Sequence, residues 1–166
     1  MLCAGNSGGE ESVTVLVPPA LAGDTVNVVV RSGGNESRPK TYPVLHANPG
    51  ILETLAGGKR TAILLHASGA MVAAANPLRR GEVLSMFVTG IGAPGAHGPQ
   101  FPFIVGVNNR GASLRSVNCG ACASGIAELR FELPQETPSG GEINLSTAVV
   151  VNGTPVYSNS STLAVP

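Results

Sequence analysis

The sequence predicts an all-β fold, and three observations point to it. Short valine-rich runs alternate with turn residues along the whole chain, whose 166 residues include 22 glycines and 13 prolines; many turns between short β-branched runs are typical of antiparallel sheets. Glu82–Thr89 alternates so that two different sets of side chains face opposite ways. No stretch has convincing helical periodicity.

An internal repeat predicts how the strands are grouped. Ser12–Val44 and Ala127–Val165 each contain an alternating strand that ends in an apolar residue and proline, Val17-Pro18 in one and Leu133-Pro134 in the other. Each then has a glycine-containing turn, three consecutive valines, a second glycine turn and a last strand ending in valine. The offset of about 116 residues is the size of one β-sandwich domain. The first copy therefore reads as an incomplete domain.

Alternation and β-branched residues mark the individual strands, and glycine or proline marks their ends. Residues 1–9 are small and polar, so we expect a disordered tail there. The predicted strands are Ser12–Val17, Thr25–Arg31, Lys40–Leu45, Ile51–Leu55, Thr61–His66, Met71–Ala74, Glu82–Thr89, Phe101–Asn108, Ala112–Ser116, Ile126–Leu133, Glu142–Val151 and Pro155–Val165.

Turn chemistry supports these boundaries. Ser32-Gly33-Gly34-Asn35 and Asn152-Gly153 are hairpin turns, because their glycines accept positive φ. Asn109-Arg110-Gly111 is expected to turn as well. Asn48-Pro49-Gly50 is a turn between two apolar runs and is the expected domain junction. Gly90–Gln100 is expected to be a loop.

Composition excludes several classes of partner. Only 12% of residues are charged and the net charge is zero, which argues against nucleic acid and against anionic membrane surfaces. No apolar run approaches the length of a membrane span. Low charge is common in extracellular β-modules. The first ten residues do not have the pattern of a signal peptide, so an exported protein would contain this chain as an interior piece.

The cysteines leave three chemistries to weigh. Cys119-Gly-Ala-Cys122 could be a redox pair, half of a zinc site or a short disulfide loop. The redox motif needs a following helix, and the zinc site needs a second ligand pair, which Cys3 and the scattered histidines do not supply. A disulfide between Cys119 and Cys122, or two free thiols, is the preferred interpretation. Cys3 lies in the predicted tail.

No residue pattern predicts catalysis, a cofactor or a metal. Gly90–Gly95 matches GxGxxG, but Pro94 follows and no helix begins there to hold a pyrophosphate. Asp24 is the only aspartate, so neither an Asp-rich calcium site nor a Ser–His–Asp triad can be assembled. Glu132 and Glu136 flank a strand end and are expected to be solvated rather than to act as paired acids.

Aromatic residues offer one weak alternative. Sugar rings stack on exposed aromatic side chains, and Phe101-Pro102-Phe103 is where such a platform, or another interaction loop, would lie. A lone aromatic pair in a β-protein more often packs in the core.

Two motifs in register resemble a known family. Ala47-Asn-Pro-Gly-Ile-Leu is similar to an "aPGIf" signature, and Asn76–Gly92 resembles "NPA-x-x-G-x-V-x-x-y-x-TGLG". With the repeated block, these residues resemble the uncharacterised Ig-like repeat domains of large secreted proteins from soil bacteria. The chain departs from that pattern at Asn108–Ala112, around Glu128-Leu129 and at the Cys119/Cys122 loop. The resemblance implies an immunoglobulin-like β-sandwich without enzyme activity, and it carries over no functional residues.

The resulting expectation is an immunoglobulin-like β-sandwich in residues 46–166, preceded in residues 10–45 by the C-terminal half of another. The valine-rich strands of the half-domain need a partner, because an isolated two- or three-stranded sheet is marginal and exposed strands recruit other chains. We expect a non-catalytic structural or adhesive extracellular module whose partners are neighbouring Ig-like domains or copies of itself, with strand addition into a surface fibre as one form. The alternative is a spacer or ligand-binding module of an exported enzyme, using the loops Gly90–Gln100 and Val117–Gly125.

Overall fold

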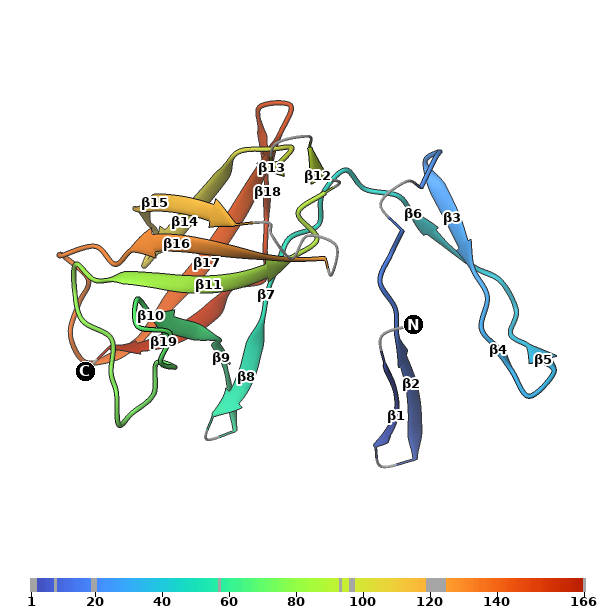
Figure 1. Ribbon diagram of the computed structural model, residues 1–166, viewed down its shortest axis with the longest axis horizontal. Helices are drawn as coiled ribbons and strands as arrows, with labels where there is room; N and C mark the ends of the chain where they lie inside the picture. The colour runs from blue at the N-terminus through green and yellow to red at the C-terminus, as the bar shows by residue number, and fades with distance from the viewer. Residues whose placement is uncertain are drawn as a thin grey trace. The chain divides into compact units, whose positions relative to one another are not determined.

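The chain divides into two compact units in a computed structural model, Met1–His46 (unit 1) and Ala47–Pro166 (unit 2). The structure describes residues 3–7, 9–18, 21–56, 58–92, 94–95, 98–118 and 125–165. All regular elements in these ranges are β-strands (Figure 1), which confirms the predicted all-β fold class.

Unit 1 consists of short antiparallel pairs. Its strands are β1 (Cys3–Ser7), β2 (Glu10–Thr14), β3 (Thr25–Val28), β4 (Arg31–Ser32), β5 (Asn35–Glu36) and β6 (Lys40–Pro43). β1 pairs with β2, β3 with β6, and β4 with β5. Cys3–Ser7, within the residues 1–9 predicted as a disordered tail, forms β1, because polar strands without an apolar pattern still pair through their backbone N–H and C=O groups.

Unit 2 holds the remaining strands. They are β7 (Gly50–Ile51), β8 (Glu53–Ala56), β9 (Lys59–Ala62), β10 (Leu64–His66), β11 (Val83–Thr89), β12 (Pro94–Gly95), β13 (Gly98–Pro99), β14 (Phe103–Val107), β15 (Arg110–Asn118), β16 (Ile126–Glu132), β17 (Gly141–Val151), β18 (Thr154–Tyr157) and β19 (Ser161–Val165). Met71–Ala74, predicted as a strand, forms isolated bridges only.

One mixed sheet, nearly closed into a barrel, organises unit 2. Its main path runs β10-β11-β16-β15-β14-β17-β19-β9-β8, with β18 attached to β17 and β7 to β11. All pairings are antiparallel except β19 with β9. β7 and β8, like β9 and β10, follow one another in sequence but lie at opposite ends of this path, so the chain links the two ends. Figure 1 shows β17 passing behind β11 and β16.

The core of unit 2 lies inside this nearly closed sheet. Leu84, Met86 and Val88 of β11 are fully buried, and Ser85 on the opposite face is buried too, so this strand buries side chains on both of its faces. Further core residues come from strands on both sides: Leu64, Val105, Val107, Leu129, Phe131, Ile143, Leu145, Val149 and Leu163.

Two hairpin turns have the positive φ angles that are typical of type I′ turns. Asn152 and Gly153 have φ of 50° and 81°, the conformation of a type I′ turn. A second such turn lies at Asn108 and Asn109, with φ of 50° and 60°. The predicted turn at Asn109-Arg110-Gly111 is therefore shifted by one residue, and Arg110 and Gly111 begin β15. Asparagine tolerates the left-handed region well enough to close this hairpin without glycine.

Candidate functional site

The same hairpin occurs once in each unit. The copy in unit 1 is called the N-terminal hairpin. Its residue pairs run from Thr25↔Pro43 to Val28↔Lys40 and continue beyond a gap as Arg31↔Glu36. In unit 2 the C-terminal hairpin runs from Gly141↔Val165 to Leu145↔Ser161 and continues between β17 and β18 as Ala148↔Tyr157 to Val151↔Thr154. In both hairpins the pairing register shifts by one residue between the part far from the turn, here called the inner part, and the part next to the turn, here called the outer part.

A serine occupies the register shift in both copies. The Ser37 hydroxyl accepts a hydrogen bond from the Val30 N–H at 3.0 Å, and the Ser37 N–H donates to the Val30 carbonyl at 2.9 Å. Ser158 and Thr147 make the same two bonds, at 3.0 and 2.9 Å. Each hydroxyl also donates to the carbonyl of the next residue, at 3.2 Å in unit 1 and 2.7 Å in unit 2.

This shared irregularity makes the equivalence of the two hairpins specific. It matches Val30 with Thr147 and Ser37 with Ser158. The serine and its backbone partner are 7 residues apart in unit 1 and 11 in unit 2, so the outer part is shorter in unit 1. Gly33 and Gly34, with φ of 56° and 82°, close the N-terminal hairpin as Asn152 and Gly153 close the other.

The C-terminal hairpin is enclosed on its sides. β14 pairs with β17 along Leu145–Val149, and β9 meets β19 at Thr162. The side chains of Ile143, Leu145 and Leu163 are 6%, 0% and 3% exposed. This hairpin is therefore part of a closed core.

The N-terminal hairpin has the same pattern but no such enclosure. Val26, Val28 and Tyr42 stand where Ile143, Leu145 and Leu163 stand in the other copy. Val26 is half-buried, whereas Val28 and Tyr42 are both 43% exposed. No strand among the described residues pairs with the side of β3 that faces away from β6. The hairpin thus presents apolar side chains on one face and an unpaired strand edge.

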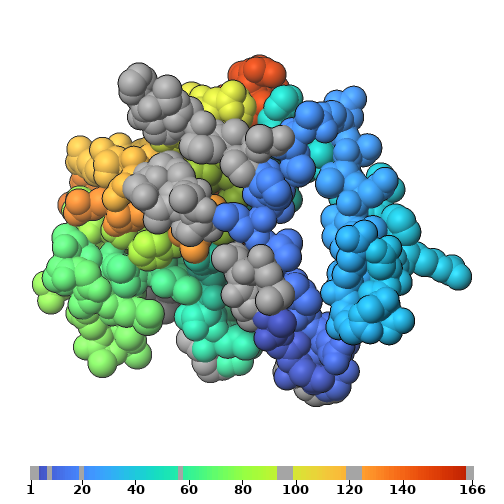
Figure 2. All heavy atoms as spheres, turned by 45° about the vertical axis from the view of Figure 1, so that its right-hand side comes forward, coloured from blue at the N-terminus to red at the C-terminus, as the bar shows by residue number. Residues whose placement is uncertain are grey.

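Unit 1 has no buried core of its own among its described residues. None of them is classed as buried. Figure 2 shows the atoms of the unit, in blue, as slender arms with an open gap between two of them rather than as one filled body. It also holds most of the exposed large apolar side chains described in the chain: Val13, Val15, Leu16, Val17, Val28, Val29, Val30, Tyr42 and Leu45.

The direction of the backbone groups along this edge follows from the hydrogen bonds already made. Asp24 and Val30 bond toward the β6 side, through the Asp24 carbonyl to the Val44 N–H and through Val30 to Ser37. Because backbone groups alternate along a strand, those of Asn27, Val29 and Arg31 point to the open edge. We call Asn27–Arg31 the open edge. Its counterpart in β17 bonds to β14.

The residues singled out in the sequence lie elsewhere. Cys119 and Cys122 lie outside the described residues, and Cys3 belongs to β1. Phe101 and Phe103 are half-buried and pack against the core of unit 2. Gly90 accepts a hydrogen bond from the Asn48 N–H at 2.7 Å, and the glycine-rich segment continues into β12.

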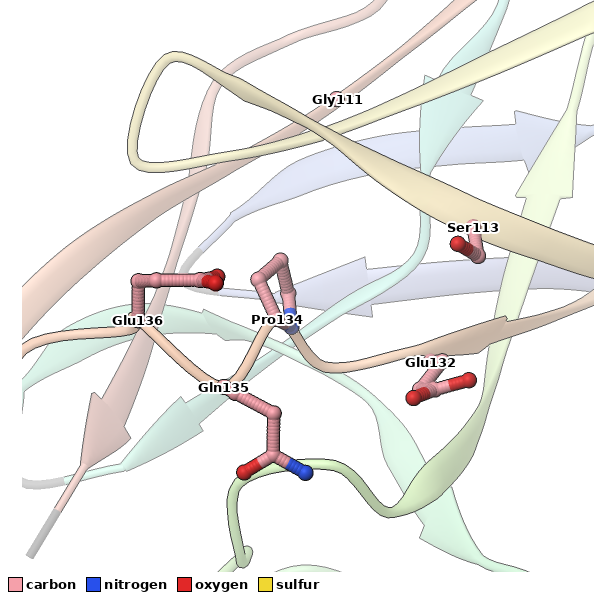
Figure 3. Close-up of a pocket in the computed structure, with 6 residues that line it drawn as sticks. All are labelled: Gly111, Ser113, Glu132, Pro134, Gln135 and Glu136. Carbon is pink, nitrogen blue, oxygen red and sulfur yellow. The ribbon is translucent and has the colours of Figure 1, made fainter.

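A polar cavity of about 260 Å³ lies at the end of β16 (Figure 3). Its lining includes two acids that were expected from the sequence to be solvated, Glu132 and Glu136. The other lining residues are Gly111, Ser113, Pro134 and Gln135.

The neighbouring contacts give this cavity a structural explanation. Glu132 pairs with Arg115. The Gln135 side chain points away from the two carboxylates in Figure 3 and covers Gly81, where a Cβ would lie 2.0 Å from the Gln135 amide nitrogen. Among the described residues that line the cavity there is neither a histidine nor a cysteine, so these residues offer no general base of the His type and no thiol nucleophile.

Sequence reasoning missed one polar cluster. The Nδ1 of His66 lies 2.9 Å from a Glu82 carboxylate oxygen, and its Nε2 lies 3.1 Å from the Asn76 carbonyl oxygen. Both partners are acceptors, so both ring nitrogens must donate, which only the imidazolium does. The hydrogen bond to Glu82, followed by that to Asn76, therefore raises the pKa of His66 above its ordinary 6.5.

The contacts of this cluster hold the loop between β10 and β11. Glu82 also accepts from the Arg79 N–H, so the cluster ties together both ends of the segment between β10 and β11. Within the described ranges, no group of three His, Cys, Asp or Glu side chains is placed to hold a metal ion. The same ranges contain no helix with the length and apolar character to cross a bilayer.

Comparisons with protein-family models, with curated proteins and with solved structures found no match for this chain.

Proposed function

We propose that this chain is a non-catalytic structural or adhesive module of the extracellular or cell-surface kind, and that unit 1 is completed by strands from outside itself. In this proposal each unit derives from one immunoglobulin-like β-sandwich plan. Unit 2 is a complete copy, and unit 1 is the C-terminal half of another. Neighbouring domains of the same plan, or other copies of the chain, supply the missing strands.

The carrying observation is the contrast between the two hairpins. They share register, serine bonds and turn type, yet Leu145 is fully buried where its counterpart Val28 is 43% exposed. Burying an exposed valine or tyrosine face stabilises by about 25 cal/mol for each Å² of apolar surface removed from water. The N-terminal hairpin has the apolar pattern of a buried strand pair, but its face is exposed. It therefore gains this energy only when a partner covers that face.

The sandwich part of the proposal is supported by the strand arrangement of unit 2. β15 pairs with β14 over Val105–Val107 and with β16 from Ser113 onward, with an irregularity between Leu114 and Ser116. β15 thus changes partners between Ala112 and Ser113, two residues before the irregularity. Sandwich corners are made by strands that switch sheets close to such bulges or bends. The strands on the two sides of that corner enclose one apolar core.

The proposal is tested by the mass of the chain in solution across roughly a hundredfold range of concentration, because strand exchange between copies obeys mass action. Size exclusion with light scattering, in the presence of a reductant that keeps Cys3, Cys119 and Cys122 as thiols, measures it. We expect the mass to rise with concentration to a dimer or a ladder of oligomers. A single-chain mass throughout contradicts assembly between copies and favours the spacer or ligand-binding alternative.

A further inference from the structure

We propose that the open edge, Asn27–Arg31, pairs antiparallel with the same edge of a second copy of this chain, around a twofold axis through Val29. This inference rests on the proposed function and names the surface and the partner that complete unit 1. The resulting contact is an isologous strand pair, in which each copy offers the same residues to the other.

The first argument is the use of the equivalent edge in unit 2. There, β17 pairs with β14 over five consecutive residues, Leu145–Val149, and the bonds continue to the Val150 N–H and the Asn144 carbonyl. Asn144 is the counterpart of Asn27. The position of the open edge in the hairpin is thus one at which this chain already builds an antiparallel pair.

The second argument is self-complementarity. With Val29 opposite Val29 of the second copy, Asn27 lies opposite Arg31 of that copy, and Val28 opposite Val30. The outward backbone groups of Asn27, Val29 and Arg31 then meet groups of the opposite type, as in the hydrogen-bonded positions of any antiparallel ladder. No two like charges face each other, because an asparagine stands opposite each arginine.

The third argument concerns the apolar face. Val28 and Val30 occupy the non-hydrogen-bonded positions of the proposed ladder, where opposite side chains approach most closely. β-branched pairs at such positions are favourable. The side chains of Val28 and Val30 are 43% and 49% exposed in the single chain. Pairing two hairpins also continues one apolar face across both copies, which joins the two surfaces that lack a core.

Charge poses no barrier to this pairing. Arg31 is the only charged residue of the open edge, and it pairs with Glu36 on its own copy. The chain as a whole carries no net charge. Two copies therefore approach without the repulsion that keeps strongly charged edges apart.

Val29→Pro tests the edge directly. Proline removes the outward N–H of Val29 and is tolerated on a free edge, while the bonds of Val30 to Ser37 stay in place. Val29→Thr is the matched control, because it keeps the backbone donor and the β-branched shape. In the full chain under reducing conditions, we expect the wild type and Val29→Thr to dimerise, and Val29→Pro to weaken dimerisation at least tenfold.

Amide hydrogen exchange gives a second readout that does not depend on a variant. At high concentration the amides of Asn27, Val29 and Arg31 should become protected, whereas protection of the Val30 amide, already bonded to Ser37, should change little. This alternation is specific to a strand pair at the open edge. Loss of the whole hairpin, by contrast, would expose Val30 as well.

The outcomes separate the two proposals. If wild type and Val29→Pro assemble equally, or protection appears without alternation, the open-edge pairing is wrong while assembly between copies stands. If the wild type stays monomeric across the whole range, both assembly and edge pairing are overturned. Circular dichroism of Val29→Pro, together with the unfolding transition of unit 2, checks that the variant remains folded.

Discussion

The hydroxyl of Ser158 accepts a hydrogen bond from the backbone N–H of Thr147 at 3.0 Å, and the N–H of Ser158 returns one to the Thr147 carbonyl. This pair lies where the register of the C-terminal hairpin shifts by one residue. A hydroxyl is needed there because the shift leaves the Thr147 N–H without a backbone acceptor across the strand. Thr147 is 1% exposed, so water does not replace that acceptor.

Ser158→Ala is therefore expected to destabilise unit 2 by about 1–3 kcal/mol, the cost of leaving a buried donor unpaired. Ser37→Ala removes the same bond from the exposed hairpin of unit 1, where water can take its place, and should leave the unfolding of unit 2 unchanged. Urea unfolding followed by circular dichroism compares the two variants. Equal losses of stability would show that the environment of the serine is not the deciding factor.

The same contrast applies to the apolar side chains. Leu145→Ala empties a fully buried site and should cost about 2–5 kcal/mol in the free energy of unfolding. Val28→Ala changes the counterpart residue, which is 43% exposed, and should stay within about 0.5 kcal/mol when the chain is dilute.

Concentration makes this second comparison sharper. At concentrations where the chain assembles, the proposed strand pairing buries Val28, and Val28→Ala should then weaken dimerisation. A Val28→Ala variant that loses several kcal/mol as a monomer would mean that unit 1 already has a core of its own. Chemical unfolding at two concentrations, with the mass measured in parallel, distinguishes these cases.

Local patterns account for what the sequence predicted correctly. Alternation placed the strand at Glu82–Thr89, and Asn152-Gly153 marked a hairpin, because a strand face and a turn are each specified by a few neighbouring residues. The repeat was visible for the same reason. The pairing of Cys3–Ser7 was missed because it depends on backbone bonds between polar residues, which leave no apolar pattern to detect.

Contacts between distant residues explain the rest. His66 and Glu82 meet because β10 pairs with β11, with His66 opposite Leu84. Their separation of 16 residues gave no motif. Likewise, Glu132 and Glu136 share a cavity because of how the chain leaves β16. The incomplete repeat predicted that unit 1 would have unpaired strands. Which residues of the open edge point outward could be derived only from the pairing register of the hairpin.

His66 makes the stability of unit 2 depend on pH. Its pKa is raised in the folded chain by the hydrogen bond to Glu82 and then by that to Asn76, while desolvation of the ring and, less strongly, the charge of Arg79 oppose the shift. A raised folded pKa means that the folded state holds the proton more tightly than the unfolded state. The stabilisation is fully present below the unfolded pKa of 6.5 and is lost as pH rises through the folded pKa.

We therefore expect the free energy of unfolding to fall across that window, and Glu82→Gln to flatten the dependence by lowering the pKa of His66. Glu142→Gln is the matched control, because its carboxylate bonds to Lys59 instead, at 2.5 Å. An NMR titration of the His66 ring, with urea unfolding on both sides of the window, measures both effects. A His66 pKa that is unchanged in Glu82→Gln would contradict the assigned cause.

Gly90 is expected to be the least replaceable glycine in the Thr89-Gly90-Ile91-Gly92 segment. Its φ is +65°, and a Cβ there would lie 1.9 Å from the backbone oxygen of Asn48, whose N–H bonds to the Gly90 carbonyl at 2.7 Å. Gly90→Ala combines the left-handed penalty of about 1–2 kcal/mol with a steric clash of about 1–3 kcal/mol. The expected loss in the free energy of unfolding is roughly 2–5 kcal/mol.

Gly153→Ala separates these two contributions. Gly153 has a φ of +81° but nothing within 4 Å of an added Cβ, so only the backbone penalty of about 1–2 kcal/mol applies. Urea unfolding of both variants measures the difference, which reports the close approach of Gly90 to Asn48. If the two variants lose the same stability, the backbone near Asn48 moves aside readily, and the tie between β11 and the start of unit 2 is softer than its geometry indicates.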